Sequence, residues 1–257
     1  QDRRAVIRFL GVVGMAAVAA PVARATGLAA KLLAGRAPLA RNTAPSRVAS
    51  PGQVALIIVD SYNDFLSEEG LTWPMLKLVA EENDLVENLL SLVAAARAGA
   101  VRIAFAPHHR YREGSFSGRK HLNPSQYMQI TSESFAEGRF GGQFYPGLAP
   151  MADDIVASEH TSSSGFAETD LHEQLAARRV SHVLLAGCIS NTCIEATARS
   201  GVDLGYHVTV VTDAIAAFSP ADHDFASRTT LPLIAHRTVT TAQAVAELRG
   251  APAQGEG

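Results

Sequence analysis

The chain has 257 residues, 47% of them hydrophobic, and a formal net charge of −3 at pH 7. This hydrophobic content excludes a largely disordered chain and is enough to build the core of one large α/β domain. Because the charge balance is slightly acidic and no basic run occurs beyond the N-terminal segment, we expect no nucleic-acid partner.

The N-terminal segment has the order of residues that is typical of an export signal. Residues 2–8 carry a pair of arginines, residues 9–23 are apolar, and small residues on either side of Arg24 offer a cleavage position. The paired arginines favour the twin-arginine route. We therefore expect residues 1–25 to be an export signal and the mature protein to be periplasmic or secreted.

Two other interpretations of this segment stay open, an uncleaved membrane anchor and an ordinary N-terminal helix. The apolar stretch is shorter than the roughly 20 residues that a spanning helix needs, so we expect no stable membrane insertion after signal cleavage. Residues 26–50 are rich in Ala, Arg, Pro and Ser and are predicted to be a linker. Residues 250–257 are predicted to be a flexible tail.

Between these ends, residues 51–249 alternate apolar runs with segments of helical periodicity. The predicted strands cover residues 54–59, 100–106, 154–157, 183–186, 207–211 and 237–240. The predicted helices cover residues 75–98, 169–179, 193–204, 221–231 and 242–248. Residues 107–150 form a long excursion, which is more often functional than idle. The alternation predicts a three-layer α/β/α, Rossmann-like fold with a mostly parallel sheet of about six strands.

Polar residues follow several of the predicted strands at their carboxyl ends. Asp60 follows the first strand, residues 107–109 the second, residues 158–160 the third, and Cys193 the fourth. In open α/β sheets, ligands bind beyond the carboxyl ends of the strands. We therefore expect these groups to meet at one edge of the sheet.

Cys193 is the candidate nucleophile, and Cys188 a buried neighbour. Thr192 and Glu195 have the spacing of a capping box, which would place Cys193 in the first turn of a helix. Free N–H groups and the helix dipole favour negative charge there, so we expect the pKa of the thiol to lie below the roughly 8.5 of free cysteine. The same N–H groups can hold the oxyanion of a tetrahedral intermediate.

Asp60 ends an apolar strand, where a carboxylate can take the thiol proton and return it to a leaving amine. The alternative is that Asp60 caps the following turn. No GxGxxG or GxxxxGK pattern follows this strand and no serine triad is evident, so we expect no cofactor.

Four ordered motifs then resemble those of the isochorismatase-like cysteine hydrolases, a family that includes nicotinamidases, carbamoyl-amide hydrolases and isochorismatases. The resemblance runs from about residue 54 to about residue 240, which is nearly the whole predicted mature chain. The motifs are DSYNDF at 60–65, SGFAETDL at 164–171, GCISNTCIEATAR at 187–199 and GYHVTVVTDA at 205–214.

The resemblance implies an Asp–Lys–Cys triad and a homo-oligomer. Cys193 would attack an amide or carbamoyl carbon, and Asp60 would shuttle the proton. The N–H groups of Ile189 and Cys193 would hold the oxyanion, aided by a cis peptide between Cys188 and Ile189.

The sequence departs from the family at the lysine. The best alignment places Ser158 there, which cannot supply a positive charge. Three interpretations stay open: a cation from the excursion fills the role, His160 pairs with the thiol, or the site is catalytically weak. The candidate cations are Arg119, Lys120 and Arg139.

The second departure concerns the metal of the family's nicotinamidases, because Pro107 stands where their aspartate is expected. Adjacent residues in an extended segment point in opposite directions, so His108 and His109 make a poor ligand pair and we expect no metal. One of the two should face the substrate pocket and the other solvent. The predicted pocket residues are Phe65, His108, His109, His160 and Phe166.

The function that we expect is an exported cysteine hydrolase, which cleaves a small-molecule amide or carbamoyl C–N bond through a Cys193 thioester. The alternatives are a binding protein that lost turnover with the lysine, an isochorismatase-type hydrolase and a redox-sensing thiol. A thiol nucleophile argues against isochorismate itself, whose vinyl ether is hydrolysed by acid catalysis.

Overall fold

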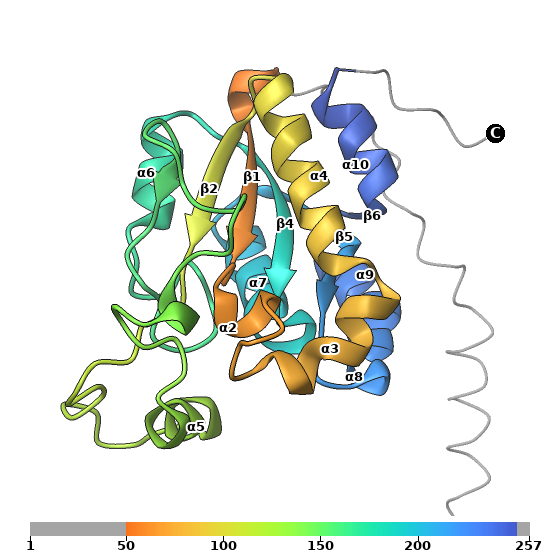
Figure 1. Cartoon of the computed structure of the whole chain (residues 1–257). Coiled ribbons are helices and arrows are strands. Elements are labelled where there is room, and N and C mark those ends of the chain that lie inside the picture. The colour runs from red at the N-terminus through yellow and green to blue at the C-terminus, as the bar shows by residue number, and fades with distance from the viewer. Residues whose placement is uncertain (1–49, 251–257) are drawn as a thin grey trace, which may run out of the picture. The chain divides into compact units, whose positions relative to one another are not determined.

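The computed structural model describes residues 50–250 (Figure 1). The predicted signal, the predicted linker apart from Ser50, and the predicted tail apart from Gly250 lie outside the described residues. Within the described part of the chain, no helix combines the length and the apolar character needed to cross a membrane.

A six-stranded parallel sheet forms the centre of the fold, in the order β3-β2-β1-β4-β5-β6. This confirms the predicted three-layer α/β/α fold. The strands are β1 Val54–Val59, β2 Arg102–Ala106, β3 Ile155–Val156, β4 His182–Cys188, β5 His207–Ala216 and β6 Arg237–Val239.

Helices and short helical turns connect the strands. The α-helices are α2 Asn63–Leu66, α3 Trp73–Glu82, α4 Leu85–Ala98, α5 Pro124–Ser132, α6 Leu171–Ala177, α7 Glu195–Asp203, α8 Pro220–Phe225, α9 Leu231–Ile234 and α10 Thr241–Leu248. The 3-10 turns are η1 Pro51–Gln53 and η2 Phe140–Gly142, and the π-helical turns are η3 Ser190–Ile194 and η4 Ala226–Thr230.

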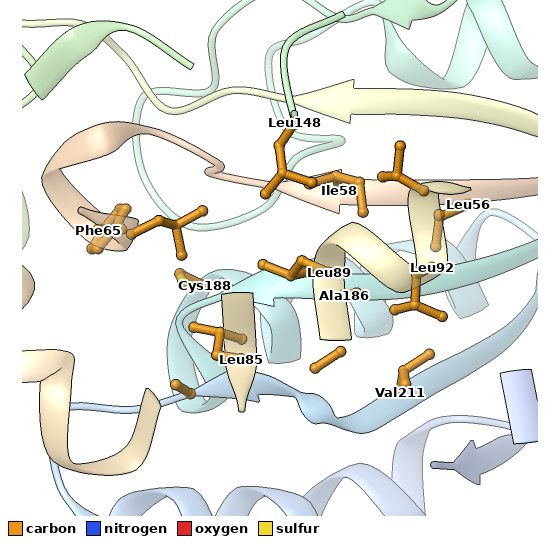
Figure 2. Packing of buried hydrophobic residues seen from close by; sticks show 14 of the residues in the cluster. Leu56, Ile58, Phe65, Leu85, Leu89, Leu92, Leu148, Ala186, Cys188 and Val211 are labelled. Atoms are coloured by element: carbon orange, nitrogen blue, oxygen red, sulfur yellow. The ribbon is translucent and has the colours of Figure 1, made fainter. Parts of the chain in front are cut away.

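Each face of the sheet carries its own apolar core, because side chains alternate along a strand. Leu56 and Ile58 of β1 join the cluster under α3, α4 and α10, which Figure 2 shows around Leu89. Ala55 and Ile57 join the cluster on the opposite face, under α6 and α7. Full burial of a leucine contributes roughly 1.5–3 kcal/mol, so the two cores together hold β1 rigidly at the centre.

Several predicted element boundaries are wrong for local reasons. The predicted helix 75–98 is two helices, because Asp84 takes a left-handed conformation, with φ of 48°, between α3 and α4. Apolar periodicity continues across this break, so the pattern could not show it. The excursion contains α5, whose start is fixed by a capping box of Asn123 and Gln126.

Gly187 allows β4 to lie close to β1 at the carboxyl ends of these two central strands. Its φ is 124°, and a Cβ there would lie 2.1 Å from the carbonyl oxygen of Val59, its register partner. Only glycine fits both the conformation and the close approach. The turn that follows β4 is thereby held close to the end of β1.

We therefore expect Gly187→Ala to lower the free energy of unfolding by at least about 3 kcal/mol, because strain and a backbone clash add. Gly205→Ala is the matched control, since Gly205 also has a positive φ of 89° but open space around it, and should cost about 1–2 kcal/mol. Denaturant unfolding measures both. Equal losses of unfolding free energy in the two variants would show that the close approach to Val59 adds nothing to the cost of Gly187→Ala.

Candidate active site

Three buried side chains meet at the carboxyl edge of the sheet. In Figure 1 this edge lies at the arrowheads of β1 and β4, next to α2. Asp60 follows β1, His160 follows β3, and Cys193 lies in η3 after β4. Their potential ligand atoms all lie within 4.8 Å of one another. His160 Nε2 donates to Asp60 Oδ1 at 2.8 Å, and both side chains are fully buried. The predicted convergence of Asp60, His160 and Cys193 is therefore confirmed.

Asp60 sits at a sharp turn of the backbone. Its N–H donates to Ala106 O at 3.2 Å, continuing the pairing of β1 with β2, and its φ of 57° is left-handed. That conformation is uncommon for a residue other than glycine, although aspartate tolerates it better than most. Strained backbone clusters at functional sites, and here it turns a carboxylate into the cluster.

His160 is held by an extension of the strand pairing. Its N–H donates to Pro107 O at 3.0 Å, and its carbonyl accepts from His109 N at 2.9 Å, so His108 and His160 form an isolated parallel bridge. The backbone thereby fixes the direction of the imidazole. His160 occupies the corner of the cluster that the resemblance assigns to a lysine.

The placement of Ser158 at that corner is wrong. Ser158 is exposed, and its N–H and hydroxyl both donate to Asp170 Oδ1, at 2.7 and 3.1 Å, next to the start of α6. This pair of hydrogen bonds turns the serine outward. The side chain that lies in the cluster belongs to His160, two residues later.

The three cations from the excursion also lie elsewhere. Arg119 pairs with Glu168 at 2.6 Å, Arg139 pairs with Glu133 at 2.6 Å, and Lys120 is exposed. Among these candidates His160 is the one that lies in the cluster, where it hydrogen-bonds Asp60 and not, as expected, the Cys193 thiol.

Cys193 lies in a π-helical turn, so the predicted capping box at this helix is wrong. Ile194 N donates to Ile189 O at 3.1 Å, which is the wide bond of a π turn, and α7 begins only at Glu195. The Glu195 carboxylate binds Arg199 instead of reaching back to Thr192. Single π turns inside helices are frequent at functional sites.

The predicted low pKa of Cys193 is also wrong. Burial raises the pKa well above that of an ordinary thiol, and the nearby Asp60 carboxylate raises it further. The Thr192 hydroxyl, 3.8 Å from the sulfur, and the Ile189 N–H lower it by less. The thiol is therefore protonated at neutral pH in the free protein, and a nucleophile forms only when a base takes its proton.

The turn before Cys193 carries the cis peptide between Cys188 and Ile189 that the resemblance implies. The Ile189 N–H lies beside the Cys193 sulfur, where it favours the thiolate. A donor so close to the attacking atom is well placed for an oxyanion.

His108 is a neutral wall of the cluster. Its ring lies edge-on to His160, with centroids 5.1 Å apart, and packs against Phe135 at 5.3 Å. Burial lowers its pKa to about 4, so the ring carries no charge at neutral pH. Its Nδ1 contacts the carbonyl of His109 at 3.0 Å.

The other predicted pocket residues lie in different surroundings. His109, predicted as a pocket residue, lies outside the cluster: it packs on Phe116 and contacts Ser115 Oγ, and it is only partly exposed. Phe65 is buried against Phe135. Phe166 stacks on Tyr206 in the core under α6 and α7, so both aromatic rings contribute to packing.

A chain of hydrogen-bonded polar groups supports η3, the turn that carries Cys193. No motif in the sequence indicated this chain. Asn83 Nδ2 donates to His223 Nε2 at 3.1 Å, which places the imidazole proton on Nδ1, where it donates to Ser190 Oγ at 3.1 Å. Ser190 is fully buried at the start of η3. The residue after α3 and residues of α8 and η3 meet here, so only the tertiary fold brings them together.

The cluster is nearly closed to solvent. Cys193 is 6% exposed, and two surface cavities, of about 510 and 400 Å³, are lined by residues other than Asp60, His160 and Cys193. The smaller cavity is lined by Asn83 and His223, two members of the polar chain that supports η3. Asp60, His160 and Cys193 are therefore almost fully shielded from bulk water in the free protein.

Because Asp60 raises the pKa of the thiol, we expect Asp60→Asn to shift the pH profile of Cys193 alkylation by iodoacetamide to lower pH. In the parent, alkylation at pH 8 should be slower than that of free cysteine, because the pKa is raised and the reactive thiolate is scarce. Mass spectrometry assigns the site, with Cys188→Ala as control for the second thiol. A parent rate at pH 7 above that of free cysteine would contradict the raised pKa.

Sequence comparisons place the chain among known hydrolases. A profile of the isochorismatase domain matches residues 54–243. The ureidoacrylate amidohydrolase RutB of Cronobacter sakazakii is 30% identical over 175 residues, which cover 64% of this chain and 75% of that enzyme. RutB of Klebsiella pneumoniae is 30% identical over 193 residues, which cover 70% of this chain and 81% of that enzyme.

Comparisons with solved structures agree with the sequence comparisons. A cysteine hydrolase from Pseudomonas syringae has a TM-score of 0.67 at 28% identity, over 79% of this chain and 95% of that one. An N-carbamoylsarcosine amidase from Thermoplasma acidophilum has a TM-score of 0.55 at 24% identity, over 73% of this chain and 95% of that one; this likeness bears on the fold alone. The chain therefore belongs to the isochorismatase family.

Proposed function

We propose that this protein is an amidohydrolase that cleaves a small-molecule amide or carbamoyl C–N bond through a thioester on Cys193. The observation that carries the proposal is the buried cluster of Asp60, His160 and Cys193, with the Ile189 N–H beside the sulfur. The family membership and the amidohydrolase relatives support the reaction class.

In the first half of the reaction, Asp60 takes the thiol proton while Cys193 Sγ attacks the carbonyl carbon. His160 Nε2 donates to Asp60 Oδ1 throughout and holds the carboxylate in place. The N–H groups of Ile189 and Cys193 stabilise the oxyanion. The intermediate collapses to a thioester as protonated Asp60 gives its proton to the leaving nitrogen.

In the second half, Asp60 takes a proton from a water molecule that attacks the thioester carbon. The tetrahedral intermediate then expels the sulfur, which recovers its proton from Asp60, and the acid product leaves. The reaction consumes one water and needs no further reactant. The raised pKa of Cys193 fits this scheme, because the thiol is activated by proton transfer during attack and not in advance.

The substrate class follows from the relatives and from the closed site. Both RutB proteins are named for ureidoacrylate, which contains a carbamoyl group on nitrogen. A nearly closed cluster favours a small substrate over a peptide or polymer. We therefore infer a small carbamoyl amide, whose hydrolysis releases ammonia.

We expect Cys193→Ala to abolish ammonia release from carbamoyl amides, and His160→Ala to lower kcat/KM by roughly 10²-fold because the base is no longer held. His160→Lys, which provides a cation at the same corner, should retain more activity than His160→Ala. Ser158→Ala is the matched control and should behave like the parent, since Ser158 lies outside the cluster.

Ammonia release and the mass of a trapped acyl-enzyme measure these outcomes. Turnover that survives in Cys193→Ala would refute the thioester. Ligand-induced thermal stabilisation without turnover in the parent would favour the alternative of a binding protein.

We also propose that the protein is exported by the twin-arginine route and acts as a homo-oligomer. Arg3 and Arg4 before the apolar run support export, and the family resemblance supports self-association. Fractionation of cells that express the whole chain checks the first, and recovery of the protein in the cytoplasm alone would oppose it. The sedimentation mass checks the second.

A further inference from the structure

We propose that Asp60, His160 and Cys193 also form a binding site for one divalent ion of the zinc class, which takes the Cys193 sulfur as a ligand and blocks the nucleophile. The binding step stands independently of the proposed hydrolysis. Only its inhibitory consequence rests on the proposed function.

The three donor atoms have the spacing that such an ion can close. Zn²⁺ binds sulfur at about 2.3 Å and nitrogen or oxygen at about 2.0–2.2 Å, so donors around a tetrahedral ion lie about 3.4–3.6 Å apart. Here all three lie within 4.8 Å of one another, and the His160 to Asp60 separation is 2.8 Å. Small side-chain rotations bring three donors onto one ion, with the fourth position left for water.

Two buried atoms of the cluster lack a partner. Asp60 Oδ2 and His160 Nδ1 are both without a hydrogen bond, although both side chains are fully buried. Within residues 50–250, His160 is the one basic side chain within ion-pair distance of Asp60. A divalent ion would offset the carboxylate and the thiolate together, leaving the buried site without net charge.

His160 is the reason why this cluster can offer a metal three ligands. A lysine ammonium has three donors and no free lone pair, so an Asp–Lys–Cys triad offers a metal only two ligands. An imidazole can offer the lone pair of Nε2 to a metal, because the proton can move to Nδ1, which has no partner in the free protein. Thiolate and imidazole favour Zn²⁺ and Co²⁺ over Mg²⁺ and Ca²⁺, which prefer oxygen ligands.

Binding forms a metal–sulfur bond and releases the thiol proton to solvent, with no change of oxidation state. The sulfur lone pair that would attack a carbonyl is then held by the metal. Asp60, as a ligand, no longer accepts a proton. The ion therefore holds the hydrolase inactive until it is removed.

Cobalt reports this site directly, because a cobalt–thiolate bond gives a charge-transfer absorption band in the near ultraviolet. We expect metal-free parent protein to develop this band with one equivalent of Co²⁺, and Zn²⁺ to displace it. Cys193→Ala and His160→Lys should lose the band, with affinity falling at least about tenfold. Cys188→Ala should keep it, as should His182→Gln at the opposite end of β4.

A band that persists in Cys193→Ala, or no band at one equivalent in the parent, would overturn the site. Thermal unfolding shows whether each variant is folded. If His160→Lys is unfolded, Cys193→Ala alone decides whether the site exists. These measurements need no substrate, so they stay informative if the proposed hydrolysis fails.

With a carbamoyl amide that the parent hydrolyses, we expect Zn²⁺ to inhibit and a chelator to restore activity. His160→Lys should resist the same zinc concentration. Activity that rises with Zn²⁺ would overturn the inhibitory role.

Discussion

The hydrogen bond between His160 and Asp60 is the interaction on which the site depends. It joins the ends of β1 and β3, which lie on either side of β2 in the sheet. The bond is fully buried, so water does not compete for it and its geometry is set by the backbone on both sides. The position of the carboxylate, and with it the fate of the thiol proton, follows from that one contact.

Burial also explains why the Cys193 thiol is protonated in the free protein. A nucleophile exposed at a helix N-terminus would be ionised by the dipole, but Cys193 is buried next to a carboxylate, and both effects favour the neutral thiol. The same surroundings strengthen every dipole that faces a developing charge. A protonated thiol in the free protein and, in the proposed reaction, strong stabilisation of the oxyanion are therefore two consequences of the same burial.

Close approach of the backbone makes this arrangement possible. Gly187 lets β4 run against Val59, and the π turn after β4 then carries Cys193 back toward Asp60. Behind that turn, Ser190 is held by His223, which is held in turn by Asn83. Cys193 is thus supported from the sheet on one side and, through Ser190, by residues at the end of α3 and in α8 on the other.

The sequence by itself determined the alternation of strands and helices, the sheet edge that holds the site, and Asp60 and Cys193 as its members. Apolar periodicity and motif order are local properties, so they can be read along the chain. The tertiary structure alone decided that His160 and not Ser158 completes the cluster, since Asp170 turns Ser158 outward. It also decided the pKa of Cys193, because desolvation depends on which distant segments cover the thiol.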